Sequence, residues 1–245
     1  MLFPDTYTNY SHPEVGKAAV EVLEAAGVRV EMAPVTDSGR PAFSKGFLDR
    51  ARDTAREAVD ALAPAVEAGR DVVVVEPSDA VMLQSDYRDL LTGSDVEAVS
   101  ANTYGVCEYL DVFRLDEGVA FTVPERSLAY HGHCHQKATK KDHHAVGVLR
   151  RAGYAVDPLD SGCCGMAGSF GYEAEHHAMS EAIGDELGAQ IDASDADVVV
   201  APGASCRTQL SDMDVRGSAP LRPGESRESP PTPVEALAVG VSGTE

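Results

Sequence analysis

The sequence lacks the features of several common protein classes. No apolar stretch approaches the roughly 20 residues that a membrane-spanning helix needs. The first residues, from Met1 to Asp5, have no basic region and no long apolar core, so we expect no signal peptide. There is also no Gly-x-Gly-x-x-Gly after a predicted strand and no Cys-x2-Cys-x2-Cys run. These absences argue against a membrane span, a dinucleotide site and a ferredoxin-type cluster within this chain.

Positive charge is scarce as well. The 245 residues include 40 acidic and 20 basic side chains, only 5 of the latter being lysine, and the formal net charge is −20. Such a charge repels phosphates and argues against a nucleic-acid partner. An acidic surface of this kind suits a protein that stays soluble at high salt, where repulsion is screened. A halophilic source is therefore favoured, with an ordinary acidic cytoplasmic protein as the alternative.

Cysteine is present in an odd number and only in the second part of the chain, at positions 107, 134, 163, 164 and 206. In a chain without a signal peptide, this distribution indicates reduced thiols in the cytoplasm. Metal binding or catalysis is then a better explanation than a disulfide framework. Cys107 stands alone on a predicted helix, and we interpret it as a buried apolar residue.

Hydrophobic periodicity predicts an α/β fold made of two similar repeats, each a small parallel sheet flanked by helices. A polar, irregular segment at 115–126 marks the expected junction, which gives domains 1–115 and 116–245. The predicted strands are residues 2–3, 28–32, 71–76, 127–131, 154–158 and 198–201. The predicted helices are residues 13–26, 47–66, 135–152 and 173–191. Residues 217–233 are expected to form a surface loop, and 234–239 a closing helix or strand.

The two halves align with an offset of 126 residues, so that Gly27 and Gly39 correspond to Gly153 and Gly165. Each half then carries the same three loops after its strands. In this register Cys163 and Cys164 correspond to Asp37 and Ser38. Cys134 corresponds to Thr6 where the starts 130–134 and 2–6 match, and Cys206 corresponds to Asp79 after one inserted residue. The first half is therefore expected to bind no cluster and to serve as scaffold. Asp37 and Asp79 could hold a hard cation, although solvated loop acids are the favoured interpretation.

Four cysteines follow predicted strands of the second half, namely Cys134, Cys163, Cys164 and Cys206. Loops after parallel strands gather at one edge of the sheet, where ligands usually bind. A site of four thiolates suits an iron–sulfur cluster or zinc. Zinc is the weaker alternative, because gaps of 28 and 41 residues separate the cysteines and two of them are adjacent.

Histidines and lysines lie close to these cysteines in sequence. His131, His133 and His135 alternate around Cys134, and any of them could ligate a metal, donate a hydrogen bond to a cluster sulfide or move a proton. His176 and His177 open the helix after the double cysteine, and one of them could face the site. The only basic cluster, Lys137, Lys140 and Lys141, could balance an anionic cluster or dock an acidic partner, against a solvated helix face as the default.

These motifs resemble the cysteine-rich CCG domain that occurs in heterodisulfide reductase and in the iron–sulfur subunits of anaerobic glycerol-3-phosphate dehydrogenase and glycolate oxidase. The likeness is greatest to the C-terminal part of FAD-linked oxidases with two such domains. The matching segments are residues 131–137, 161–172 and 201–207, with weaker likeness at 2–6 and 39–41.

The resemblance implies that residues 116–245 are a CCG domain in which Cys134, Cys163, Cys164 and Cys206 bind a [4Fe–4S]-type cluster, cubane or non-cubane. It also implies that residues 1–115 are a degenerate copy without ligands. The family's last motif is often Cys-x-x-Cys, and here Gly203 replaces its first cysteine. That change puts a five-cysteine non-cubane arrangement in doubt.

The function implied is electron transfer, as a subunit or domain of a flavin-linked dehydrogenase or oxidase for a hydroxy acid or glycerol 3-phosphate. FAD would lie on a partner flavoprotein, and a ferredoxin-type iron–sulfur protein is a further expected partner. The expected location is the cytoplasm, or the inner face of the membrane through a partner. Two alternatives stay open: a thiol/disulfide redox protein of heterodisulfide reductase type, and a non-catalytic interaction module with or without zinc.

Overall fold

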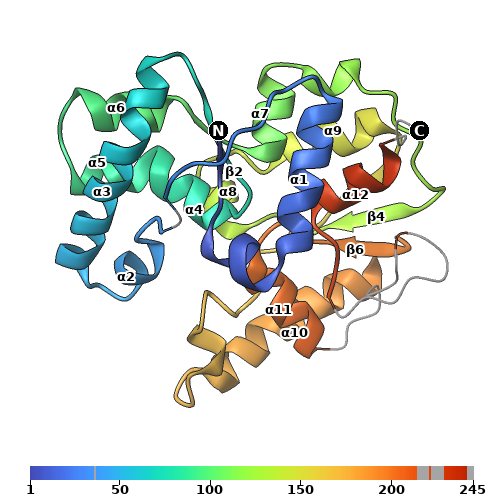
Figure 1. The fold of residues 1–245 in the computed structure, drawn as a ribbon. Coiled ribbons are helices and arrows are strands. Elements are labelled where there is room, and N and C mark those ends of the chain that lie inside the picture. The colour runs from blue at the N-terminus through green and yellow to red at the C-terminus, as the bar shows by residue number, and fades with distance from the viewer. Residues whose placement is uncertain (36, 214–220, 222–228, 242–245) are drawn as a thin grey trace. The chain divides into compact units, whose positions relative to one another are not determined.

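The computed structural model describes residues 1–35, 37–213, 221 and 229–241. The chain is a mixed α/β structure with two compact units, Met1–Tyr109 and Leu110–Glu245 (Figure 1). The α/β class and the two small parallel sheets predicted from the sequence are confirmed. The boundary falls within helix α7 (Val106–Val112), before the polar segment in which the sequence places it. None of the described helices has the length and apolar character needed to cross a membrane.

The first unit is built on a parallel sheet in the order β1-β2-β3. Its strands are β1 (Leu2–Phe3), β2 (Val72–Val74) and β3 (Thr103–Gly105). A parallel bridge between Leu2 and Met32 extends the sheet on the other side of β1. This bridge is all that forms of the predicted strand at 28–32. The start of that segment instead closes a helix, since the Val28 N–H donates to the Leu23 carbonyl at 2.9 Å.

Helices cover the sheet of the first unit, and their apolar side chains form the core of this unit together with side chains of the strands. The longer ones are α1 (Pro13–Ala25), α3 (Leu48–Glu67) and α6 (Ser94–Ala101). Side chains of β1 and β2, including Phe3 and Val74, pack with Leu62 of α3 and Val99 of α6. The shorter helices are η1 (Tyr7–Ser11), α2 (Arg40–Ser44), α4 (Pro77–Val81), η2 (Met82–Asp86) and α5 (Tyr87–Leu90).

The second unit repeats this arrangement with a parallel sheet in the order β5-β4-β6. Its strands are β4 (Ser127–Tyr130), β5 (Ala155–Pro158) and β6 (Val198–Val200). The central strand β4 corresponds to β1, β6 to β2, and β5 to the bridge at Met32. The equivalence of the two halves that the sequence predicts is therefore visible in the strand order.

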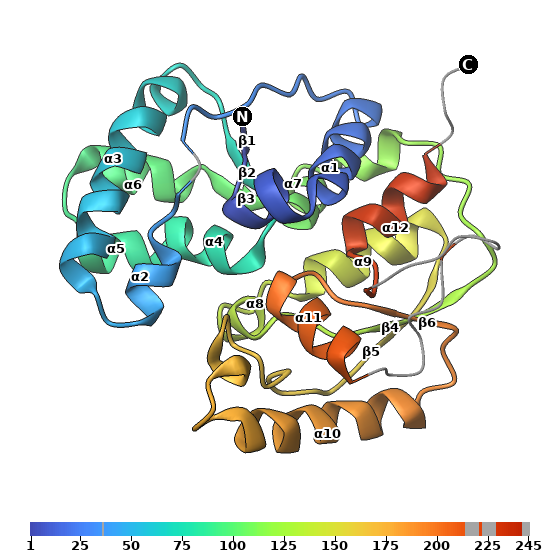
Figure 2. The same ribbon diagram turned by 60° about the horizontal axis from the view of Figure 1, so that its bottom comes forward.

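The helices of the second unit lie on both faces of its sheet (Figure 2). Ala129 and Val199 pack with α10 (His177–Ala193) and α11 (Ala204–Asp212), and Figure 2 shows α9 (His143–Ala152) and α12 (Pro233–Gly240) on the opposite side. The closing segment is thus a helix, begun by a capping box between Thr232 and Glu235. Most of the predicted loop at 217–233 lies outside the described residues.

One helix prediction in the second unit is wrong. Residues 135–152 form two helices, α8 (Cys134–Ala138) and α9, rather than one. The break lies at Lys140, whose φ of 58° is in the left-handed region and is incompatible with a continuous helix. Two short 3-10 turns, η3 (Leu115–Gly118) and η4 (Phe170–Tyr172), complete the unit.

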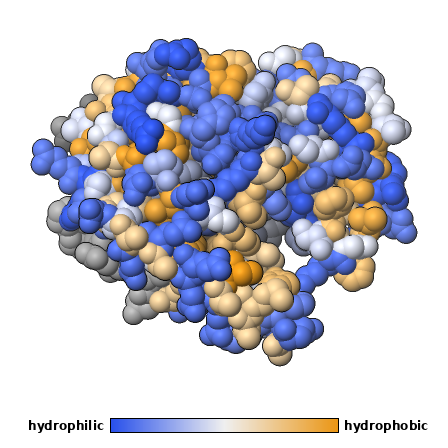
Figure 3. All heavy atoms as spheres, turned by 180° about the vertical axis from the view of Figure 1, so that it is seen from behind, coloured by the Kyte–Doolittle hydropathy of each residue, from blue (hydrophilic) through white to orange (hydrophobic). Residues whose placement is uncertain are grey.

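On the face of the molecule in Figure 3, hydrophilic and apolar side chains are interspersed.

Candidate metal centre

Three loops at the carboxyl ends of the second sheet carry the four thiols. Cys134 is the first residue of α8, which follows β4. Cys163 and Cys164 lie between β5 and α10, and Cys206 lies on the first turn of α11, after β6. The chain therefore places all four at the sheet edge where parallel α/β folds bind ligands. All four are free thiols in the structure.

The thiols form a continuous group. Cys163 contacts the thiols of both Cys134 and Cys164, and Cys164 in turn contacts Cys206. Cys164 and Cys206 are buried, with 3% and 2% of their surface exposed, whereas Cys134 and Cys163 are half-buried. The group thus has a closed inner end and an end that is open to solvent. The expectation that three loops would bring these cysteines together agrees with this geometry; their binding of a cluster stays a prediction.

The thiols shift one another's pKa. Contact with Cys134, and then with Cys164, lowers the pKa of the Cys163 thiol against the opposing effect of burial. Contact with Cys164 likewise lowers the pKa of Cys206, and the nearby imidazoles of His131 and His133 add to this effect. The pKa values of Cys134 and Cys164 are raised, since each donates its S–H to a neighbouring sulfur. Thiolate is the form that binds metal, so Cys163 and Cys206 are the two thiols of the group whose surroundings favour that form.

The double-cysteine loop holds its shape through close contact with α10. Gly165 has a φ of 98°, and a Cβ built there would lie 2.4 Å from the Ser180 carbonyl oxygen. A Cβ at Gly171 would lie 2.5 Å from the Ser180 hydroxyl. The Gly165 N–H also donates to the Cys163 sulfur at 3.4 Å. These glycines therefore have a packing role as well as a conformational one.

Among the histidines, His131 lies with the thiols. It follows β4, is fully buried, and has one ring nitrogen within 4.8 Å of the sulfurs of Cys164 and Cys206. Its Nδ1 bonds to the Ser161 hydroxyl at 2.7 Å. The sequence alone leaves His131, His133 and His135 as equal candidates. A signal that separates them is position, since His131 directly follows a buried strand and its backbone N–H still bonds to Val200 at 2.9 Å.

The other histidines have local partners. His133 caps α8, because its Nδ1 accepts the His135 N–H at 3.3 Å, and the two rings meet edge to face. His176 stacks on Phe170, with ring centroids 4.1 Å apart. His177 bonds to the Gly171 carbonyl at 3.1 Å and lies in a separate cleft. Neither His176 nor His177 joins the group of residues with metal-ligand spacing around Cys164.

A family comparison agrees with this geometry. Residues 128–211 match the family model of the cysteine-rich CCG domain. We refer to residues 128–211 as the CCG domain, after the family that they match. The match begins in β4 and ends in α11, so it spans all three loops that carry the thiols. The resemblance expected from the sequence is confirmed.

Similar proteins match nearly the whole chain. The chain is 30% identical to a subunit of the anaerobic glycerol-3-phosphate dehydrogenase of Escherichia coli K12, over 85% of this chain and 54% of that protein. It is 28% identical to the D-2-hydroxyglutarate dehydrogenase of the same strain, over 89% and 21%. It is 26% identical to the lactate utilization protein A of Geobacillus kaustophilus, over 90% and 93%. The chain thus spans about half of the first relative and about a fifth of the second.

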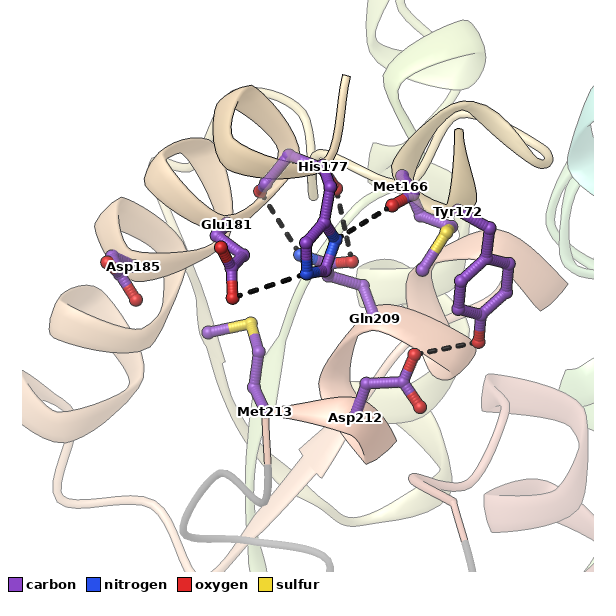
Figure 4. Close-up of a pocket in the computed structure, with 10 residues that line it drawn as sticks. Met166, Tyr172, His177, Glu181, Asp185, Gln209, Asp212 and Met213 are labelled. Carbon is purple, nitrogen blue, oxygen red and sulfur yellow. Dashed lines mark hydrogen bonds and ion pairs between the residues drawn. The ribbon is translucent and has the colours of Figure 1, made fainter. Parts of the chain in front are cut away.

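The CCG domain has a polar cleft of about 430 Å³ beside Met166, which follows the double-cysteine loop (Figure 4). Tyr172 donates to Asp212 at 2.7 Å on one side, and His177 lies 3.6 Å from Glu181 on the other. Figure 4 shows the two pairs on opposite sides of the lining, with Met213 next to Glu181. The cleft has none of the four thiols in its lining.

The first unit has a polar counterpart at the position of the buried thiols. Ser38 donates a short hydrogen bond to Asp79, just as Cys164 contacts Cys206 in the CCG domain. Asp79 is only 7% exposed, so its interpretation as a solvated acid is wrong, whereas Asp37 is exposed and accepts the Gly39 N–H at 2.8 Å. In the described part of the chain, these two acids do not form a group with metal-ligand spacing. Burial raises the pKa of Asp79 to about 8, with the charge of Glu76 adding to it.

Proposed function

We propose that this chain is an iron–sulfur electron-transfer domain or subunit that works with a flavin-linked dehydrogenase. One observation carries the proposal: four unpaired thiols from three loops meet at the carboxyl edge of the CCG domain's sheet, partly buried and partly open. Iron–sulfur clusters are held by cysteine thiolates in this way. Relatives named as dehydrogenases or as a dehydrogenase subunit support the same proposal.

Cys134, Cys163, Cys164 and Cys206 are the proposed ligands. The donor set fits the group, since each of the four sulfurs contacts at least one other. The lowered pKa values of Cys163 and Cys206 favour thiolates, whereas Cys134 and Cys164, whose pKa values are raised, would lose their protons on binding. When bound, a cluster of [4Fe–4S] type would accept and release single electrons. The protein would bury its inner side against Cys164 and Cys206, and would leave Cys134 and Cys163 nearer the solvent, where a redox partner approaches.

The proposed partners follow from what the chain contains. It has no dinucleotide signature of its own, so FAD would lie on a partner flavoprotein, with a ferredoxin-type protein as a further partner. The substrate would be a hydroxy acid or glycerol 3-phosphate, as the names of the relatives suggest. We also propose a cytoplasmic site of action and a halophilic source. The halophilic source is tested by unfolding the protein at rising concentrations of potassium chloride, since the free energy of unfolding should then increase.

Anaerobic purification with iron, sulfide and zinc analysis tests the proposal. We expect about four iron per chain and an EPR signal after reduction or oxidation. Cys164→Ser should lose most of this iron, whereas Cys107→Ser, which changes a thiol of α7 outside the group, should keep it. Zinc in place of iron, or full iron in Cys164→Ser, would contradict the proposal. Zinc would favour the interaction module instead.

Electron transfer itself has a direct readout. When photochemically reduced flavin is mixed anaerobically with the iron-loaded protein, one electron should pass from the flavin to the site. The visible absorbance of the iron-loaded protein should then bleach. Cys164→Ser should show no such bleaching. A loaded protein that reduced flavin leaves unchanged would separate cluster binding from the proposed role in electron transfer.

A further inference from the structure

One buried nitrogen in the CCG domain lacks a partner. His131 is fully buried, and its Nε2 has no partner at normal hydrogen-bond geometry among the residues that the structure describes, although its imidazole is near enough to the Cys206 thiol to lower the pKa of that thiol. A buried polar atom without a partner costs about 1–3 kcal/mol, so such atoms are rare and call for an explanation. Nδ1 is occupied by Ser161, so Nε2 is the ring nitrogen that remains available to the group of thiols.

The partners of Ser161 decide which ring nitrogen carries the proton. The Lys137 ammonium, which is a donor only, donates to the Ser161 hydroxyl at 3.1 Å and also to the Ser161 carbonyl. The hydroxyl therefore receives one hydrogen bond, and its own hydrogen needs an acceptor. The only other partner recorded for this hydroxyl in the described structure is Nδ1 of His131, at 2.7 Å. A hydroxyl that donates to Nδ1 leaves the imidazole proton on Nε2.

Lys137 reaches Ser161 because Gly132 leaves room for it. A Cβ at Gly132 would lie 2.9 Å from the Lys137 Cε and 3.3 Å from the Tyr130 ring. Because Gly132 has no side chain, the Lys137 side chain of α8 can lie against the residues that follow β4. Gly132, between two histidines, is thus part of the same arrangement.

Resting on the proposed function, we infer that His131 is a hydrogen-bond donor to the sulfur atoms of the site and not one of its ligands. Its Nε2–H is the donor available to the sulfurs of Cys206 and Cys164, which lie within 4.8 Å of one of its ring nitrogens, and it would be available to a cluster sulfide bound there. Lys137 and Ser161 are positioning residues that set the tautomer. A donor to sulfur stabilises the reduced, more negative cluster and so raises its reduction potential.

Two substitutions separate a donor from a ligand. His131→Leu keeps most of the side chain's volume and removes the N–H, whereas His131→Gln places an amide N–H near the position of Nε2. We expect both variants to keep the iron content of the native protein. The midpoint potential, measured by an EPR-monitored titration, should move to a more negative value in His131→Leu and stay near the native value in His131→Gln. His143→Leu, at an exposed histidine of α9, is the control and should change neither.

Each outcome decides the inference. Loss of iron in His131→Leu with a native circular dichroism spectrum, or a strong nitrogen hyperfine coupling in the native protein that this variant abolishes, would make His131 a ligand and overturn the inference. An unchanged potential in His131→Leu would also overturn it. If His131→Leu does not fold, Ser161→Ala is used in its place and should shift the potential in the same direction.

The proposed function and this inference fail in different ways. A native protein that takes up no iron contradicts the proposed function alone. The donor is then tested with cobalt(II) added to the anaerobic protein, whose thiolate-to-metal absorbance band should shift in His131→Leu and not in His131→Gln. An identical band in the native protein and in His131→Leu would overturn the inference there too.

Discussion

The two units place different chemistry on the same turn. After equivalent strands, the CCG domain has Cys164 in contact with Cys206, and the first unit has Ser38 bonded to Asp79. The glycine that follows has a positive φ in both, 98° at Gly165 and 78° at Gly39. The turn therefore does not depend on the thiols, and sequence change at these positions has altered the chemistry without altering the fold.

The difference lies in how each site is completed. In the first unit, the Tyr87 hydroxyl donates to the Ser38 carbonyl at 3.0 Å, and Arg40 bonds to the Ser78 carbonyl at 3.0 Å and to Asp86. These contacts join the segment after the Met32 bridge to the segment after β2 through protein groups alone. In the CCG domain, Cys134 and Cys163 are free thiols that stay half-buried. The loops of the first unit are thus fastened by protein groups, whereas the second unit keeps two partly exposed thiols, which is what the proposed cluster site requires.

The largest expected effect comes from Gly165→Ala. The added Cβ would meet the Ser180 carbonyl at 2.4 Å, and alanine at a φ of 98° is itself strained by about 1–2 kcal/mol. The loop must move away from α10, so we expect destabilisation of about 3 kcal/mol or more and loss of most of the iron. Thermal unfolding and iron analysis measure the two effects.

Gly162→Ala is the matched control within the same loop. A Cβ at Gly162 meets nothing within 4 Å, and its φ is not positive. This variant should keep the native melting temperature and iron content. A Gly165→Ala protein with native iron would mean that the close approach of the loop to α10 is not needed for the site.

Arg40→Gln should have a smaller effect, confined to the first unit. Its side chain is 11% exposed and its partner Asp86 is 21% exposed, so the pair is partly desolvated and its loss should cost about 2 kcal/mol. Iron content should not change, because Arg40 lies in the unit without thiols at this turn. Arg56→Gln breaks an exposed pair with Asp53 and should cost less than about 0.5 kcal/mol. Equal losses in the two variants would show that Arg40 does not fasten these loops.

The shared turn is also what the sequence predicts best. Gly39 and Gly165 are local requirements of the backbone, and the valine runs of β2 and β6 identify buried parallel strands without any knowledge of their neighbours. The gathering of the four cysteines follows from the strands of the second unit, since the cysteines lie in the segments after β4, β5 and β6. Local patterns thus give the fold class and the arrangement of the candidate ligands.

What the sequence does not predict depends on contacts between distant residues. The bond between His131 and Ser161 joins residues 30 apart, and the bond between Ser38 and Asp79 joins residues 41 apart. No periodicity encodes these pairs, so local patterns reveal neither that Ser161 is the partner of His131 nor that Asp79 is buried. The break between α8 and α9 at Lys140 has no local sign either, because lysine is a good helix former and rarely adopts a left-handed conformation.

Counted per pH unit, the smallest expected effect is a pH dependence of stability that Asp79 gives to the first unit. Burial raises the pKa of Asp79 to about 8, helped by the charges of Glu76 and Asp5 and opposed by Ser38 and Arg40; the hydroxyls of Tyr7 and Tyr87 lie nearby. In the unfolded chain this carboxyl loses its proton near its ordinary value of 3.8. Between these values the folded chain binds the extra proton, so the unfolding free energy falls as pH rises.

The slope of this dependence is at most about 1.4 kcal/mol per pH unit for one proton. Asp79→Asn keeps an acceptor for Ser38 and removes the titration, so its stability should fall less than that of the native chain between about pH 5 and pH 8. Urea unfolding of the full chain at several pH values measures the difference. Asp60→Asn, which removes an exposed carboxyl of α3, should keep the native slope. If Asp79→Asn also keeps it, then Asp79 is ionised in the folded chain, and the carboxyl that replaces the thiol of Cys206 carries a charge that the surrounding groups must balance.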